Sequence, residues 1–312
     1  MLRIRVLSPT EYSERARRLL LDAPGATHVT VFPGAALRPA GDVIEAVLTR
    51  ECADDLLSAL SELGLDRTGG ITLETIDTVL SEAADAAERA VPGDPADAVI
   101  WDELIESTGE DSRLTMSFLA FLTIACVLAA IGAITDSPVT VVGAMVLGPE
   151  FGPLAALAVG VVLHRGDLIR RAGLALVVAF PVAMGITALA GVLFALTGLV
   201  SPTDIDNIPQ VDFVYKVGPF SLIIALLAGA AGMLSLTSAK SGALVGVFIS
   251  VTTVPAAGFA AVAAVEGRWD RVLSSTAQLL VNLAGLVLAG AVVLWLSPSA
   301  RKRRLVDQRR AR

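Results

Sequence analysis

The chain has few of the residues on which most catalytic and metal sites depend. Its 312 residues include two cysteines, two histidines and 5% aromatic residues. Cys52 and Cys126 form no disulfide framework or metal-binding motif, and His28 and His164 are isolated, so we predict no metal and no cofactor. The apolar segments contain no Ser/His pair, paired aspartates or His-Glu zinc motif. We therefore expect that the protein is not an enzyme.

Positive charge is scarce in the first third of the chain. Residues 1–110 carry 9 Lys and Arg against 21 Asp and Glu, a net charge of −12. Residues 111–312 carry 15 against 10, a net charge of +5, and the two sums give the overall −7. A nucleic-acid surface requires clustered cations, so we expect no nucleic-acid partner. The composition instead indicates an acidic soluble part joined to an apolar part with basic ends.

The acidic part alternates between strand-like and helical patterns, with turns marked by proline and glycine. No signal peptide precedes it, so we expect it to remain in the cytoplasm. The order of elements is βαββαβ, which predicts an N-terminal α+β ferredoxin-like domain over residues 1–78, followed by a helical connector over 79–113. The strands are expected at Leu2–Leu7, Val29–Phe32, Asp42–Leu48 and Ile71–Ile76, and the helices at Thr10–Leu21 and Ala53–Leu63.

The remainder of the chain consists of long apolar segments, and the mean hydropathy of the whole chain is +0.70. Each segment reaches or exceeds the roughly 20 residues that a helix needs to cross a bilayer. We therefore predict a polytopic α-helical membrane domain with six spans. They are expected at about 114–135, 138–164, 168–199, 217–238, 241–266 and 271–296.

The second apolar segment is interrupted around Glu150. Two prolines and two glycines flank this residue, and both types weaken a helix, so the helix should break there. Irregular backbone at membrane depth is tolerated only inside protein or beside a wet cavity, and an ionisable residue there marks a candidate functional site. The flanking residues are Gly148, Pro149, Gly152 and Pro153.

A shift of 103 residues aligns the six segments as two sets of three. Arg165 then falls on Arg268, Asp167 on Asp270, and the break at 148–153 falls on 251–256. The positive-inside rule favours the interrupted segment crossing the membrane, because the Arg-rich loop at 164–171 then lies inside with the C-terminal tail. We thus expect an inverted 3+3 repeat with two broken helices, an architecture common in transporters, whose half-helices begin at the prolines.

The second break offers hydroxyl groups just before Pro255, and the last span carries two amides four residues apart, on one helix face. The hydroxyls could instead cap the helix, the amides could only join helices, and Glu150 could be a neutral carboxyl or a helix cap. The candidate substrate- or ion-binding residues are Glu150, Gly148, Gly152, Ser250, Thr252, Thr253, Gln278 and Asn282.

The stretch Thr140-Val141-Val142-Gly143-Ala144-Met145, the following Gly-Pro-Glu-Phe-Gly-Pro and the loop with Arg165 and Asp167 resemble the domain of unknown function family 389. This family comprises integral membrane proteins of bacteria and archaea that carry an uncharacterised hydrophobic domain. The resemblance covers roughly residues 100–300 and implies a membrane fold, but no substrate. Many members have an apolar residue in place of Glu150, so the resemblance implies no role for this carboxylate across the family.

The leading hypothesis is a carrier or channel for a small solute or ion in a prokaryotic plasma membrane, with both termini cytoplasmic and the acidic domain acting as a sensor or oligomerisation module. The alternative is a non-transporting receptor or scaffold that signals from its N-terminal domain. The expected partners are the lipid bilayer, the solute and further copies of the chain. The expected parts are 1–78, 79–113, repeat 1 at 114–199, an outer loop at 200–216, repeat 2 at 217–296 and a basic tail at 297–312.

Overall fold

A computed structural model describes residues 1–93, 98–199, 208–238 and 252–297. The chain forms two compact units, Met1–Leu104 and Ile105–Arg312. The division falls within the stretch expected to be a connector. That stretch contains two helices, α4 (Glu82–Ala90) and α5 (Trp101–Asp111).

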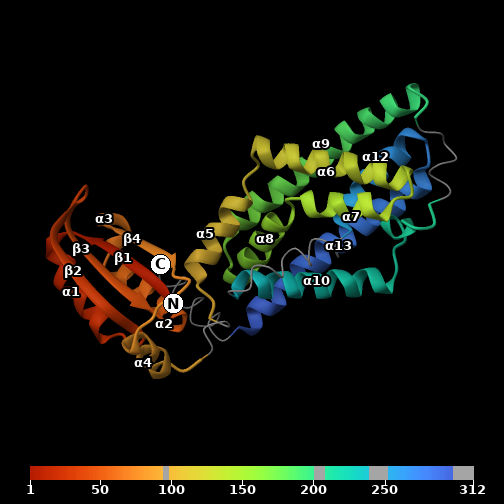
Figure 1. Cartoon of the computed structure of the whole chain (residues 1–312). Coiled ribbons are helices and arrows are strands. Elements are labelled where there is room, and N and C mark those ends of the chain that lie inside the picture. Colours follow the sequence, from red (N-terminus) through yellow and green to blue (C-terminus); the bar gives the residue numbers. More distant parts are fainter. Residues whose placement is uncertain (94–97, 200–207, 239–251, 298–312) are drawn as a thin grey trace. The chain divides into compact units, whose positions relative to one another are not determined.

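The first unit contains a four-stranded antiparallel sheet in the order β2-β3-β1-β4 (Figure 1). The predicted βαββαβ order is confirmed, with one short extra helix, α3, before the last strand. The elements are β1 (Leu2–Ser8), α1 (Thr10–Asp22), β2 (Ala26–Leu37), β3 (Ala40–Leu48), α2 (Arg50–Glu62), α3 (Leu65–Thr68) and β4 (Gly70–Thr75).

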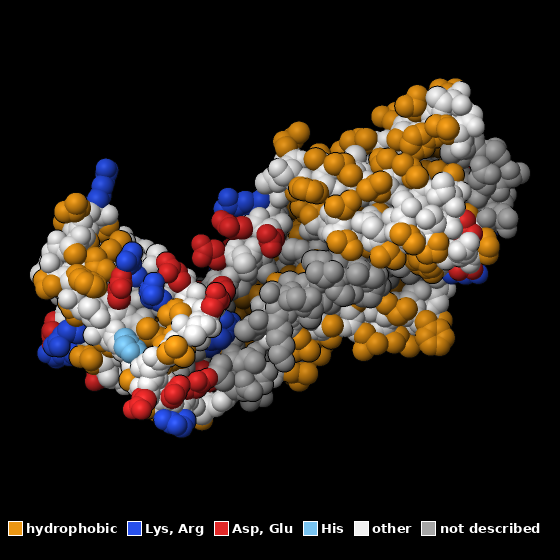
Figure 2. All heavy atoms as spheres, in the orientation of Figure 1, with side chains coloured by type: hydrophobic (Ala, Val, Ile, Leu, Met, Phe, Trp, Pro, Cys, Tyr) orange, Lys and Arg blue, Asp and Glu red, His pale blue; other side chains and the backbone are white. Residues whose placement is uncertain are grey.

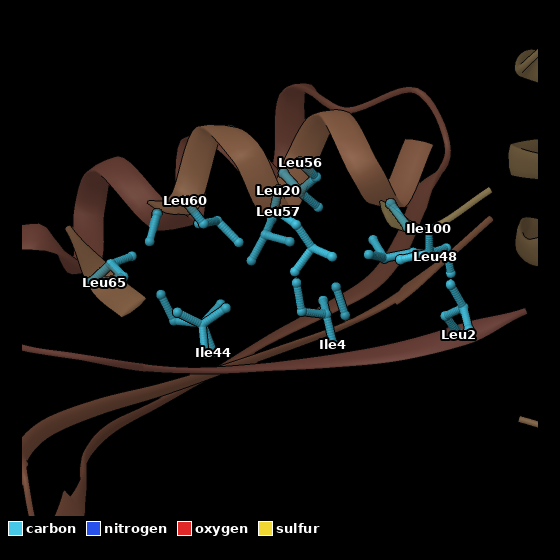
Figure 3. Packing of buried hydrophobic residues seen from close by; sticks show 14 residues of the cluster. Leu2, Ile4, Leu20, Ile44, Leu48, Leu56, Leu57, Leu60, Leu65 and Ile100 are labelled. Atoms are coloured by element: carbon cyan, nitrogen blue, oxygen red, sulfur yellow. The ribbon is translucent and has the colours of Figure 1, made fainter. Parts of the chain in front are cut away.

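The alternation in β1 places its even-numbered residues on the covered face of the sheet, because successive strand side chains point to opposite faces. Ile4 lies opposite Ala46 of β3 and Leu73 of β4. Leu20 of α1 and Leu60 of α2 pack onto this face, and both are fully buried (Figure 3). The first unit thus has its own core of large aliphatic side chains.

The second unit is helical. Four of its described helices are long and apolar enough to cross a membrane, with window hydropathies between 2.0 and 2.5, and a bent pair of helices would make a fifth span. The sixth predicted span, 241–266, lies partly outside the described residues, so six spans are not confirmed. The helices are α6 (Met116–Ile134), α7 (Pro138–Leu147), α8 (Phe151–Leu163), α9 (Gly166–Leu196), α10 (Pro219–Thr237), α12 (Thr253–Val265) and α13 (Trp269–Leu296), with a 3-10 turn, η1, at Asp212–Val214.

The helical unit has small residues inside and large apolar residues outside, which is typical of helices packed within a membrane. Leu189 of α9 is 71% exposed and Phe220 of α10 is 78% exposed. Hydrophobic side chains accordingly cover much of the visible face of these helices (Figure 2). Inside, Gly258 of α12 lies so close to α6 that an added Cβ would be 2.4 Å from the carbonyl oxygen of Cys126.

The two helices that begin near the predicted breaks form the centre of this unit. In α8, 10 of 13 residues are buried, and in α12, 11 of 13 are buried. α12 contacts α6, α7, α9 and α13. Because α8 and α12 begin at the two predicted breaks, these breaks lie at the bundle interior, where an ordinary soluble loop would not be placed.

Candidate functional site

The predicted helix break around Glu150 is present. α7 ends at Leu147, α8 begins at Phe151, and their axes are bent by 53°. Gly148 at the end of α7 has extended backbone, and Glu150 is the residue immediately before α8. The structure thus confirms that the segment is interrupted at this glycine-proline-glutamate sequence.

The half-helices begin two residues earlier than the sequence pattern indicated. α8 starts at Phe151 and α12 at Thr253, so Pro153 and Pro255 are each the third residue of their helix. This position suits proline equally well, because the first four N–H groups of a helix have no partner within it. The proline therefore marks the first turn rather than the first residue.

Glu150 is 7% exposed and lies among apolar helices. Its side chain makes no capping hydrogen bond to α8. Instead, Thr253 Oγ1 donates a hydrogen bond of 2.5 Å to Glu150 Oε1. The second carboxylate oxygen, Oε2, is buried and has no hydrogen-bond partner among the described residues. The carboxylate therefore joins the two broken segments, and one of its oxygens remains available.

Thr252 connects the second break to α13. Its Oγ1 accepts hydrogen bonds from Asn282 Nδ2 at 2.6 Å and from Gln278 Nε2 at 3.3 Å. Its side chain makes no capping hydrogen bond to α12. Gln278 and Asn282 are 2% and 3% exposed, so the expected shared face of these amides does point into the bundle.

Among the described candidate residues, five side chains therefore gather at the start of α12 as one polar cluster, of which all but Thr252 are buried: Glu150, Thr252, Thr253, Gln278 and Asn282. Gly148 lies beside the cluster, since an added Cβ there would be 2.2 Å from Glu150 Oε2. Gly152 instead faces Asp111, whose Cβ lies 2.5 Å from the corresponding position. Ser250 lies outside the described residues.

Two polar residues near this site were not predicted from the sequence. Ser275 is fully buried, and its Oγ has no hydrogen-bond partner among the described residues. It lies three residues before Gln278 and seven before Asn282, so the spacing of polar residues along the last apolar segment could have indicated it. Asp111, which contacts the first break, precedes the apolar segments and carries no such signal.

A cavity of about 410 Å³ reaches the first break. Its walls include Gly148, Pro149 and Gly152 from the break, and Glu110 and Asp111 from the end of α5. Partial burial, and secondarily the neighbouring Glu110 carboxylate, raise the pKa of Asp111 above its ordinary value. No group of three or more His, Cys, Asp or Glu side chains that could hold a metal ion occurs in the described parts of the chain.

Comparison with known proteins assigns a family but no activity. An uncharacterized protein of Methanocaldococcus jannaschii is 24% identical over 195 residues, which cover 62% of this chain and 58% of that protein. The match thus spans less than two thirds of the relative. No solved structure matches. Residues 145–288 match the model of the domain of unknown function DUF389. This range contains both predicted breaks and the whole described polar cluster, so the part of the chain that carries the candidate site is the part that matches this family model.

Proposed function

We propose that the helical unit is a membrane-embedded carrier or channel for a small solute or ion, with its binding site at the polar cluster between the two helix breaks. The observation that carries this proposal is the contact between Glu150 and Thr253, each at the start of a buried half-helix. Burying a carboxylate among apolar helices is unfavourable unless it is compensated. Intramembrane ionisable groups at interrupted helices typically bind what a transporter moves.

A repeated architecture supports the same proposal. α6 covers 116–134 and α10 covers 219–237, so both ends differ by 103 residues, and α9 and α13 begin 103 residues apart, at 166 and 269. Glu150 and Thr253 are also separated by 103 positions. Two equivalent residues contact each other when they lie at the axis that relates two repeats. We therefore propose an inverted 3+3 repeat of six spans whose axis passes between these residues.

The proposed orientation places both termini in the cytoplasm of a prokaryote. The Arg165 loop and the nearby Arg170 and Arg171 would then face inward, in accordance with the positive-inside rule. The acidic N-terminal unit would be a cytoplasmic sensor or oligomerisation module, and the working assembly a homo-oligomer. Lys240 and the basic residues of the tail, which contribute to this orientation, lie outside the described residues.

Flux into liposomes tests the proposal. Wild-type protein and Glu150→Gln would be reconstituted, and entry of Na⁺, K⁺ and H⁺ followed with ion-sensitive dyes. We expect wild-type flux of at least one of these ions and background flux in Glu150→Gln, because glutamine keeps the size but not the charge. Glu266→Gln, the same substitution at the end of α12, is the matched control and should retain flux.

The proposal fails if wild-type protein shows no flux above that of empty liposomes and a structure in lipid shows both breaks sealed by dry packing. A ligand that raises the melting temperature of the protein without any flux would instead favour a receptor or scaffold. No catalytic role is part of the proposal.

A further inference from the structure

The polar cluster and the adjoining turn of α13 together contain three buried oxygen atoms that lack a hydrogen-bond partner in the described parts of the chain. They are Glu150 Oε2, Ser275 Oγ and Gln278 Oε1. Their residues are 7%, 0% and 2% exposed. Buried polar atoms in native proteins almost always have a partner, so each exception calls for a bound group. Three such exceptions in one cluster indicate a shared ligand.

Two of the three oxygens belong to side chains that are hydrogen-bonded to the start of α12, and the third belongs to the neighbouring turn of α13. Glu150 is held by Thr253, and Gln278 by Thr252. Ser275 precedes Gln278 by three residues on α13, which places the two on one helix face. A carboxylate, an amide carbonyl and a hydroxyl are oxygen donors of the type that hard cations prefer.

The charge at the site fits a monovalent cation. α7 ends and α8 begins at the same break, so their opposite partial charges, each about half an elementary charge, largely offset each other. The start of α12 then offsets only about half of the carboxylate charge. With one carboxylate in the cluster, a monovalent cation leaves a net charge of only about half an elementary charge, whereas a divalent cation would leave about one and a half in an apolar surrounding.

A bound proton accounts for the cluster less well. A proton on Glu150 Oε2 would neutralise the carboxylate, but Oε2 has no hydrogen-bond partner in the described chain to accept that proton. It would also leave the oxygens of Ser275 and Gln278 unpaired. A cation with several oxygen ligands satisfies all three atoms at once.

The cavity beside the first break is lined by the residues on both sides of Glu150, but not by Glu150 itself. Gly148 lines this cavity, and an added Cβ on Gly148 would lie 2.2 Å from Glu150 Oε2. Exposed carboxylates from Glu110 and Asp111 line the cavity and attract cations, while Arg113 contributes one opposing charge. The charged side chains of the cavity lining therefore sum to a net negative charge. The lining residue nearest to the Glu150 carboxylate is a glycine, Gly148.

We infer that Glu150, Ser275 and Gln278 bind a small monovalent cation such as Na⁺, which enters through the cavity lined by Gly148 and Asp111. This inference rests on the proposed function and deepens it, because it assigns the transported or coupling ion to a chemical class. Thr252 and Thr253 act as positioning residues that hold the amide and the carboxylate in place.

The test is the melting temperature of the full-length protein in detergent, with NaCl exchanged for choline chloride at constant ionic strength. A ligand that binds only the folded state stabilises it by mass action. We expect wild-type protein to melt about 5 °C or more higher at an Na⁺ concentration 100 times its Kd, and ²²Na⁺ to bind in the same range. Glu150→Gln should lose both responses, Ser275→Ala should bind at least about tenfold more weakly, and Glu266→Gln should match the wild type.

The inference is overturned if wild-type protein melts at the same temperature in Na⁺ and choline, or if Glu150→Gln retains the full Na⁺ response. The wild-type titration and Ser275→Ala decide the matter even if Glu150→Gln does not fold. Na⁺ binding without flux in liposomes would overturn the proposed function and keep the inference. Flux without any Na⁺ effect on melting or binding would overturn the inference and keep the proposed function.

Discussion

The interiors of the two units of this protein differ in the residue types that they contain. In the first unit, large aliphatic residues such as Ile4 and Leu60 are fully buried and most charged residues are outside. In the helical unit, alanine and glycine make up much of the interior, beside large residues such as Phe259, while Leu189 and Phe220 are exposed. The first pattern gains stability by removing apolar surface from water. The second needs an apolar surrounding, since its outer surface would otherwise be unfavourably exposed.

The two interiors also differ in their polar residues. Buried polar side chains of the first unit, such as Ser8 and Thr49, lie at the ends of strands or helices. The helical unit buries a charge-bearing residue, Glu150, at its centre together with two amides. Such a cluster opposes stability unless it is fully paired, and three of its oxygens are unpaired. The comparison teaches that the first core is made of aliphatic side chains, whereas the second interior also holds a carboxyl group and two amides.

The largest expected effect concerns the aliphatic interior. Leu60→Ala removes a fully buried side chain from the first core and should lower the free energy of unfolding of that unit by about 2–5 kcal/mol. Native-state hydrogen exchange of the amides in β1 and β3 would measure this loss. Leu80→Ala, at a position 94% exposed, is the control and should change little. Equal effects of the two substitutions would contradict the assigned core.

The helical interior should respond to added volume instead. Gly258→Ala places a Cβ 2.4 Å from the backbone oxygen of Cys126, so α6 and α12 must separate, at a cost of about 1–3 kcal/mol. Thermal unfolding in detergent would show the loss. Gly173→Ala in α9 is the control, because nothing lies within 4 Å of its added Cβ, and it should be neutral or stabilising. A neutral Gly258→Ala would show that these helices are not in close contact.

Removing the Thr253 hydroxyl tests whether its hydrogen bond to Glu150 is needed for flux as well as for stability. Thr253→Val leaves Glu150 without its hydrogen bond and should cost about 1–3 kcal/mol, with a matching loss of flux. Thr253→Ser keeps the hydroxyl and should retain most flux. Thr187→Val is the control, because that buried hydroxyl donates only to Ala183 O of its own helix, and it should change flux little. If Thr253→Val transports normally, this contact has no role in the site.

The smallest expected effect lies on the surface of the first unit. Hydrogen bonds from Arg17 and Arg18 lower the pKa of Glu14 from 4.5 to about 2. A lowered folded-state pKa stabilises the fold above pH 4.5, and this contribution is lost as the pH falls toward 2. Glu14→Gln should therefore be slightly less stable than the wild type at pH 7, and the difference should shrink below pH 4.5. Acid titration of both proteins followed by circular dichroism measures it, and a difference that grows in acid would refute the assignment.

Local patterns predicted the order of the main elements of the first unit but not all of their ends, since β2 runs over Ala26–Leu37 where Val29–Phe32 was expected. The alternation in Leu2–Leu7 and the helical spacing in Thr10–Leu21 gave elements within one or two residues of those observed. Strand and helix periods depend on the chain itself, and turn residues mark their ends. The spans at 217–238 and 271–296 were likewise predicted to within a few residues.

The contacts of the candidate site could not be predicted from such local patterns. Helical spacing placed Gln278 and Asn282 on one face, but it could not show that both amides would donate to Thr252. Capping was the more common use of the hydroxyls of Thr252 and Thr253, and neither hydroxyl caps α12. Ser275 was overlooked because a serine within an apolar helix usually bonds to its own backbone.

The sequence by itself determined the helix break beside Glu150 and most of the apolar helices, because each of these depends on residue type and spacing along one chain. Only the tertiary structure decided that Glu150 meets Thr253 and that one carboxylate oxygen stays unpaired. Which neighbour a helix face meets depends on how several helices pack against one another, and hydrogen bonds form only over short distances with suitable directions.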